Sequence, residues 1–152
     1  MLLSDVTELP NQGIIIGLDP GSKTLGVAAS DSLQLTAHPV ETIQRGKKLA
    51  PTLTRLFELF DERGAIGIVM GLPLNMDGSA GPRVQSARAL ARHILQIRDV
   101  PIAFQDERMS SQMAERAMLE ADLSRARRAE LIDKSAAAII LQTAIDRIAN
   151  AS

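Results

Sequence analysis

The chain has 152 residues, of which 45% are hydrophobic and 23% are charged, and its net charge at pH 7 is −1. These values are typical of a globular protein with one buried core. The near-neutral charge excludes a protein that coats nucleic acid through overall basicity, and the lack of Trp and Tyr argues against a base-stacking platform. The chain has no cysteine, which excludes thiolate chemistry and favours a cytoplasmic location.

The N-terminal sequence and the lengths of the apolar runs indicate how the domain is organised. Residues 1–13 include acidic residues and lack the basic region of a signal peptide, so we expect a mobile tail. No apolar run is long enough to span a bilayer, so we expect no membrane association. The remaining residues, 14–150, are expected to form a single domain.

The stretch that follows the tail predicts a β-hairpin. Two apolar runs, residues 14–18 and 25–29, flank turn residues at positions 20–23. Asp19 ends the first run. A carboxylate at the end of an apolar segment is costly to desolvate unless a positive group meets it, and Lys23 and a metal ion are both candidates.

The rest of the chain alternates between predicted strands and helices. We expect strands at residues 38–43, 66–70 and 102–104, a loop at 71–82, and amphipathic helices at about 49–63, 84–95, after 110 and 129–148. The last helix is apolar almost all round, as expected of a helix packed against a sheet. Helices between parallel strands predict an α/β sheet with helices on both faces.

Three acidic residues stand next to apolar sequence. Asp19 ends the first strand, Glu107 follows the last strand, and Asp133 lies near the start of the closing helix. If the first, fourth and fifth strands are parallel, Asp19 and Glu107 reach the carboxyl edge of the sheet, where open α/β sheets bind ligands. Asp146 lies on the opposite side of the closing helix from Asp133 and is expected to be solvated.

Carboxylates that converge repel one another unless cations neutralise them. Oxygen ligands suit Mg²⁺ or Mn²⁺, and a pair of such ions can promote hydrolysis of a phosphodiester. The only histidines, His38 and His93, support neither a zinc site nor a Ser–His–Asp hydrolase. Each acidic residue alone is more often a turn, cap or solvated residue than a metal ligand, so their joint placement carries the metal hypothesis.

Four ordered segments resemble the YqgF/RuvX family. They are GLDPGSKTLGVA at 17–28, GLPLNMDGSAG at 71–81, DERMSS at 106–111 and LIDKSAAAIILQ at 131–142. The family is described as a Holliday-junction-resolvase-like nuclease and as the nuclease that processes the 5′ end of pre-16S ribosomal RNA. The resemblance covers residues 14–148. It implies a ribonuclease H-like fold with a mixed five-stranded sheet of order 3-2-1-4-5, an antiparallel second strand, and helices on both faces.

The resemblance also implies a set of site residues. Asp19, Glu107 and Asp133 correspond to the catalytic carboxylates that bind the metal. The residues expected to contact substrate are Lys23, Asn75, Ser79, Arg108, Arg125, Arg127 and Arg128. The segment from Asn75 to Ser79 precedes a predicted helix, and it suits either phosphate binding or fixing of the loop. A simple turn at 77–78 with Ser79 as a helix cap is an equal alternative.

The resulting leading hypothesis is a metal-dependent nuclease that acts on structured RNA, namely pre-16S ribosomal RNA. Cleavage of four-way DNA junctions is an alternative with the same chemistry. A ribosome-assembly factor that binds RNA without cutting it is an alternative of another class. The hairpin at 19–28 also resembles the phosphate-binding motif of sugar kinases and actin-like ATPases, but those proteins pair two domains around the nucleotide. Whether the chain is a monomer or a homodimer stays open.

Overall fold

The computed structural model describes residues 1–75, 77–108 and 135–151. The strands in this part of the chain are β1 (Ile15–Pro20), β2 (Thr24–Ser30), β3 (Ala37–Gln44), β4 (Gly67–Leu72) and β5 (Ile102–Asp106). They form one sheet in the order β3-β2-β1-β4-β5. Strand β2 is antiparallel to β1 and β3, whereas β4 is parallel to both β1 and β5. The predicted strand order 3-2-1-4-5 is therefore confirmed.

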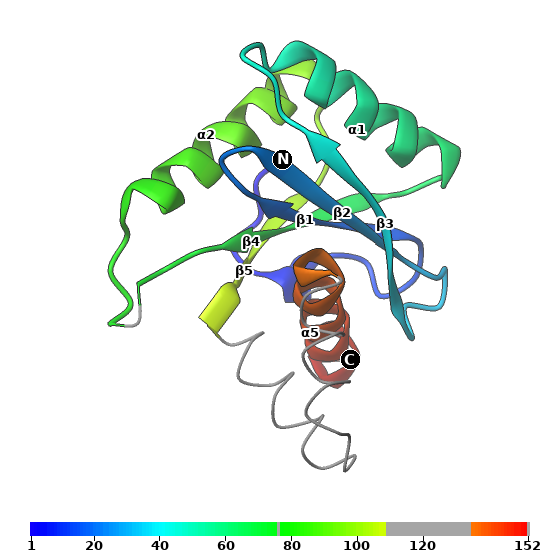
Figure 1. The fold of residues 1–152 in the computed structure, drawn as a ribbon. Helices are drawn as coiled ribbons and strands as arrows, with labels where there is room; N and C mark the ends of the chain where they lie inside the picture. The colour runs from blue at the N-terminus through cyan, green and yellow to red at the C-terminus, as the bar shows by residue number, and fades with distance from the viewer. Residues whose placement is uncertain (76, 109–134, 152) are drawn as a thin grey trace, which may run out of the picture.

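The sheet lies between two helical layers. Helices α1 (Ala50–Glu62) and α2 (Pro82–Ile97) cover one face, and α5 (Ala136–Ala151) covers the other (Figure 1). Successive residues of a strand point to opposite faces, so Ile16 belongs to the core under α1 and α2, whereas Ile15 belongs to the core under α5. Burial on both faces explains why β1 and β4 have almost continuous apolar sequences.

The helix ends follow from local sequence signals. Helix α1 stops where Gly64 adopts φ +64°, as the sequence predicts for a glycine just after the helix. In front of α5, the Ser135 hydroxyl accepts a hydrogen bond from Ala138 N at 2.9 Å and caps the helix. The predicted start of the closing helix near residue 129 and the predicted helix after residue 110 lie outside the described residues. None of the helices described is long and apolar enough to cross a membrane.

The N-terminal segment is packed against the domain, in contrast to the mobile tail that the sequence predicts. Leu2 forms a parallel bridge with Ile102 along the outer side of β5. The 3₁₀ helix η1 (Val6–Glu8) follows, and Val6 and Leu9 are buried in the core under α5. Leu2, Val6 and Leu9 follow the i, i+4, i+7 spacing of one helical face, but the burial of Val6 and Leu9 depends on tertiary partners that this short pattern does not show.

A polar contact joins this segment to the far end of α5. Arg147 donates hydrogen bonds to the Asp5 carboxylate at 2.9 Å and to Gln105 Oε1 at 3.0 Å. Gln105 is fully buried in β5. Arg147 thus connects the N-terminal segment, the closing helix and the last strand.

We expect Val6→Ala to lower the free energy of unfolding by about 1–3 kcal/mol, because it removes two buried methyl groups and leaves a cavity. Leu33→Ala is the control, since Leu33 is 64% exposed and its truncation should change stability by no more than about 0.5 kcal/mol. Urea unfolding followed by circular dichroism measures both variants. Equally small effects would show that the N-terminal segment does not contribute to the folded unit.

Candidate active site

Asp19 and Glu107 come together at the carboxyl edge of the sheet, as the sequence predicts. Asp19 is the penultimate residue of β1, and Glu107 directly follows β5. Strand β4 lies between these two strands and is parallel to both. The Asp19 carboxylate lies within hydrogen-bonding reach of the Glu107 side chain, close enough for the two negative charges to interact.

Gly71 of β4 provides the space that the Glu107 carboxylate occupies. A Cβ atom on Gly71 would lie only 2.6 Å from Glu107 Oε1 and 3.1 Å from Glu107 Cγ. It would also lie 2.6 Å from the Cδ1 atom of Ile140 on α5. The Glu107 side chain therefore rests directly on the backbone of β4 beside α5. The sequence pattern predicts Gly71 only as the first loop residue, although a glycine in a buried strand often marks the close approach of another group.

The environment of Glu107 opposes its negative charge. Burial and the neighbouring Asp19 carboxylate raise the pKa of Glu107 to about 7, and the positive charge of Arg83 opposes this rise. Glu107 Oε1 is buried and has no hydrogen-bond partner among the described residues. A buried carboxylate oxygen without a partner is costly unless a cation meets it. This pair of carboxylates fits an oxygen-preferring divalent cation such as Mg²⁺ or Mn²⁺.

The third predicted carboxylate, Asp133, lies outside the described residues, so its role stays a prediction. Within residues 1–75, 77–108 and 135–151, no cluster of three His, Cys, Asp or Glu side chains could hold a metal ion. Ser135, two positions after Asp133 in the sequence, lines the same cleft as Asp19. Asp146 is exposed and accepts a hydrogen bond from Gln142 at 3.0 Å, which agrees with its predicted solvation.

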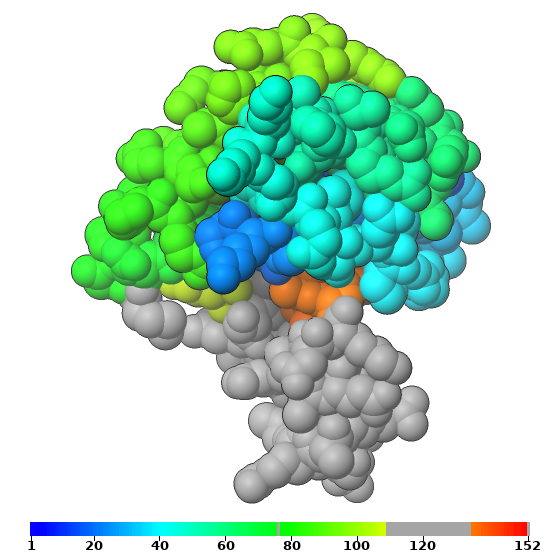
Figure 2. All heavy atoms as spheres, turned by 45° about the horizontal axis from the view of Figure 1, so that its top comes forward, coloured from blue at the N-terminus to red at the C-terminus, as the bar shows by residue number. Residues whose placement is uncertain are grey.

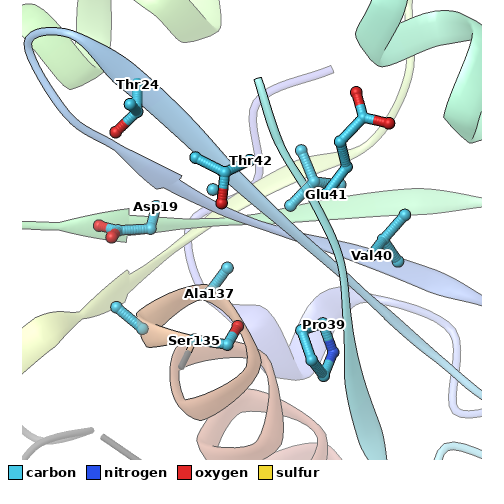
Figure 3. Close-up of a pocket in the computed structure, with 11 residues that line it drawn as sticks. Asp19, Thr24, Pro39, Val40, Glu41, Thr42, Ser135 and Ala137 are labelled. Carbon is cyan, nitrogen blue, oxygen red and sulfur yellow. The ribbon is translucent and has the colours of Figure 1, made fainter. Parts of the chain in front are cut away.

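A cleft of about 620 Å³ opens beside Asp19 (Figure 3). Its other lining residues come from β2, β3 and the start of α5: Thr24, Gly26, Val27, Pro39, Val40, Glu41, Thr42, Ser135, Ala136 and Ala137. Figure 2 shows the face on which the β1–β2 turn (blue), β3 (cyan) and the start of α5 (orange) adjoin. The cleft thus extends from Asp19 across β2 to the edge strand β3.

The loop after β4 is held by hydrogen bonds among its own residues. Asn75 Nδ2 donates to Ser79 Oγ at 3.0 Å, and Ser79 Oγ donates to Asp77 Oδ1 at 2.6 Å. Gly78 adopts φ +89° at the turn. These contacts favour the loop-fixing alternative over direct phosphate binding by the side chains. The cap of α2 is Gly81, so the alternative in which Ser79 caps the helix is wrong.

The predicted basic residues differ in their surroundings. Arg108 folds back onto Asp106, with its Nη2 donating to the Asp106 carboxylate at 2.7 Å. A Cβ on Gly78 would lie 3.6 Å from Arg108 Nη1, so this guanidinium reaches the loop after β4. Lys23 is exposed in the β1–β2 turn. The remaining predicted contacts lie outside the described residues: Arg125, Arg127 and Arg128.

The fold and the carboxylate pair define a class of protein. A sheet of this order, with acidic residues at the carboxyl ends of the first and last strands, is the arrangement of ribonuclease H-like nucleases. The chain belongs to the RuvX family, whose model, described as a Holliday junction resolvase, matches residues 13–147. The family to which the four sequence segments point is therefore confirmed.

Relatives of known name extend over nearly the whole chain. A Rhodobacter capsulatus protein named "Putative pre-16S rRNA nuclease" is 55% identical, and the match covers 93% of this chain and 89% of that protein. A Bradyrhizobium protein of the same name is 49% identical, with 97% and 91% covered.

Solved structures show the same fold at low sequence identity. RuvC of T. thermophilus in complex with a Holliday junction substrate matches with a TM-score of 0.55 and 14% identity, covering 90% of this chain and 96% of that one. The yeast mitochondrial Holliday junction resolvase matches with a TM-score of 0.52 and 13% identity, covering 95% and 86%. The predicted ribonuclease H-like fold is thereby confirmed.

We expect Gly71→Ala to weaken Mn²⁺ binding by about tenfold or more, because the added methyl group displaces the Glu107 carboxylate. Gly46→Ala is the control, since nothing lies within 4 Å of a Cβ at that position. Isothermal titration calorimetry with Mn²⁺ measures both variants, and a thermal melt establishes that each is folded. An unchanged Mn²⁺ affinity in folded Gly71→Ala protein would contradict the role assigned to Gly71.

The raised pKa of Glu107 predicts a pH dependence of stability. Between its ordinary value of 4.5 and about 7, the folded chain holds a proton that the unfolded chain has lost. The metal-free protein should therefore lose stability as the pH rises through this window, by on the order of 1–3 kcal/mol. Glu107→Gln should remove this pH-dependent part of the stability. Urea unfolding in EDTA at pH 5 and pH 8 tests the difference, and an identical pH dependence in both proteins would refute it.

Proposed function

We propose that the chain is a metal-dependent nuclease of the cytoplasm that cleaves a phosphodiester in pre-16S ribosomal RNA. The observation that carries the proposal is the pair of carboxylates at one sheet edge, with a buried Glu107 oxygen that lacks a partner within the described chain. Membership of the RuvX family supports phosphodiester cleavage. The names of relatives that are about 50% identical support precursor ribosomal RNA as the substrate.

The proposed metal ligands are Asp19, Glu107 and Asp133. Two bound ions, Mg²⁺ or Mn²⁺, would supply an activated water and stabilise the leaving oxygen of the phosphodiester. The chain itself fixes the carboxylates. Asp19 is held by a central strand that pairs on both sides, and Glu107 is held by the β4 backbone at Gly71. These elements limit the reorganisation that the carboxylates would otherwise need during the reaction.

Local positive charge is proposed to hold the substrate, because the net charge of the whole chain is slightly negative. The residues proposed to contact phosphates are Lys23, Arg108, Arg125, Arg127 and Arg128. Asn75 and Ser79 are proposed to act indirectly, since their side chains bond to each other and shape the loop that Arg108 reaches. Solution scattering would show whether the chain binds its substrate as a monomer or as a homodimer.

A second candidate is cleavage of four-way DNA junctions. The description of the matching family model and the fold shared with a junction-bound RuvC favour it. Both candidates use the same carboxylates, so assays with RNA and with a synthetic junction separate them. A non-cutting assembly factor would show no cleavage of either substrate with Mn²⁺. An ATPase is not supported, because the chain belongs to a nuclease family.

Sequencing the 5′ ends of 16S ribosomal RNA tests the proposed substrate. In cells depleted of the protein, precursors with extended 5′ ends should accumulate, and a copy of the wild-type chain should restore mature ends. A copy with Asp19→Asn should fail to restore them. Mature 5′ ends in cells that contain only Asp19→Asn protein would overturn the proposal.

In purified protein we expect Asp19→Asn to lower the cleavage rate by more than roughly 100-fold. Loss of a contact that supports a metal ligand already lowers activity, and loss of the ligand itself should lower it further. The melting temperature should stay the same or rise, because the substitution removes repulsion between carboxylates. Asp146→Asn, on the exposed side of α5, should retain activity. Asp19→Asn protein that keeps full activity, or that melts far below the wild type, would contradict the metal-ligand role.

A further inference from the structure

A row of three paired residues crosses the sheet at Asp19. Asp19 of β1 pairs with Gly26 of β2, and Gly26 pairs with Thr42 of β3. Directly paired residues point to the same face, so the row faces α5. Gly26 adds no side chain, and a Cβ there would lie 3.4 Å from Asp19 Cβ and 3.6 Å from Ala137 Cβ. The floor of the cleft between the Asp19 carboxylate and Thr42, about 10 Å away at two strand spacings, therefore carries no side chain at Gly26, and Ala137 of α5 bounds the space above it.

The volume of the cleft suits a small ligand. A volume of about 620 Å³ lies within the range of sites for small molecules and suits a single nucleotide. It is too small for a duplex. Asp19 itself lines the cleft, so any occupant lies beside this carboxylate.

The side chains that line the cleft suit the sugar and base of a nucleotide better than its phosphate. Among the described lining residues there are three hydroxyls, from Thr24, Thr42 and Ser135, and no Lys, Arg or His. The Glu41 carboxylate turns away from Thr42 and forms two hydrogen bonds with Arg55, at 2.7 and 2.9 Å (Figure 3). These described lining residues carry no positive charge that would favour a further phosphate, whereas their hydroxyls can both donate to and accept from a sugar or a base.

We propose that this cleft binds the sugar and base of the nucleotide next to the phosphodiester that the carboxylates hold. The inference rests on the proposed nuclease function and identifies where one neighbouring nucleotide lies. The substrate strand runs along the cleft beside Gly26 and Ala137, and the Thr42 hydroxyl forms a hydrogen bond with the nucleotide at the outer end of the cleft. The Ser135 hydroxyl already accepts from Ala138 N and keeps its own hydrogen for donation.

The absence of native cysteine allows a footprinting test, because an introduced thiol is the only one in the protein. Thr42→Cys places the thiol in the cleft. Thr54→Cys places it at an exposed position of α1, on the opposite face of the sheet. The alkylation rate with N-ethylmaleimide is measured with Ca²⁺ in place of Mg²⁺. The two probes are a single-stranded RNA that spans the pre-16S 5′ end and a synthetic DNA junction, with binding followed by fluorescence anisotropy.

Bound RNA should slow alkylation of the Thr42→Cys protein about tenfold and leave the Thr54→Cys protein unchanged. Protection by the junction and not by RNA would support the cleft while overturning RNA as the substrate. Equal alkylation rates with and without either bound nucleic acid would overturn the cleft proposal. Failure of both probes to bind would overturn it together with the proposed function.

Kinetics supply a second, independent readout. Thr42→Val should raise KM for the RNA by about two- to tenfold, the range expected for one lost hydrogen bond, and leave Mn²⁺ affinity unchanged. Gly26→Val, which fills the floor, should raise KM further. Thr54→Val is the matched control and should behave as the wild type. Unchanged KM values in both folded cleft variants would show that no nucleotide occupies this space.

Discussion

Two carboxylates that repel each other lie at one edge of the sheet, and the rest of the structure keeps them together. Asp19 cannot move away because β1 is the central strand and is paired on both sides. Glu107 rests on the backbone at Gly71, and Ile140 of α5 lies against the same glycine. The raised pKa of Glu107 reports the cost of this placement. A divalent cation that binds both groups would convert that cost into affinity.

The two faces of the sheet have different roles. The face under α1 and α2 holds the larger apolar core and lacks the acidic pair. The face under α5 carries the two carboxylates, the cleft and the contact between Gly71 and Glu107. The position of α5 therefore sets the geometry of the site. Far from the site, Arg147 binds Asp5 and Gln105, so the N-terminal segment helps to hold this helix on the sheet.

Some of this arrangement could be predicted from the sequence and some could not. The placement of Asp19 and Glu107 followed from a simple rule, because acidic residues after parallel strands meet at one edge. The strand order came from the family resemblance. The role of Gly71 depends on the contact between β4 and a residue beyond β5, which no local pattern encodes. The burial of Val6 likewise depends on contacts distant in sequence. Asp133 and the arginines at 125, 127 and 128 stay predictions.

The most direct measurement is the affinity of the protein for Mn²⁺ as a function of pH. If Asp19 and Glu107 bind the ion together, Glu107 must first lose its proton, so affinity at pH 8 should exceed that at pH 5.5 by roughly tenfold or more. Calorimetry in buffers of different ionisation enthalpy should also detect a released proton at the lower pH. An affinity that does not change with pH, or that is the same in Glu107→Gln protein, would contradict a shared metal site at these carboxylates.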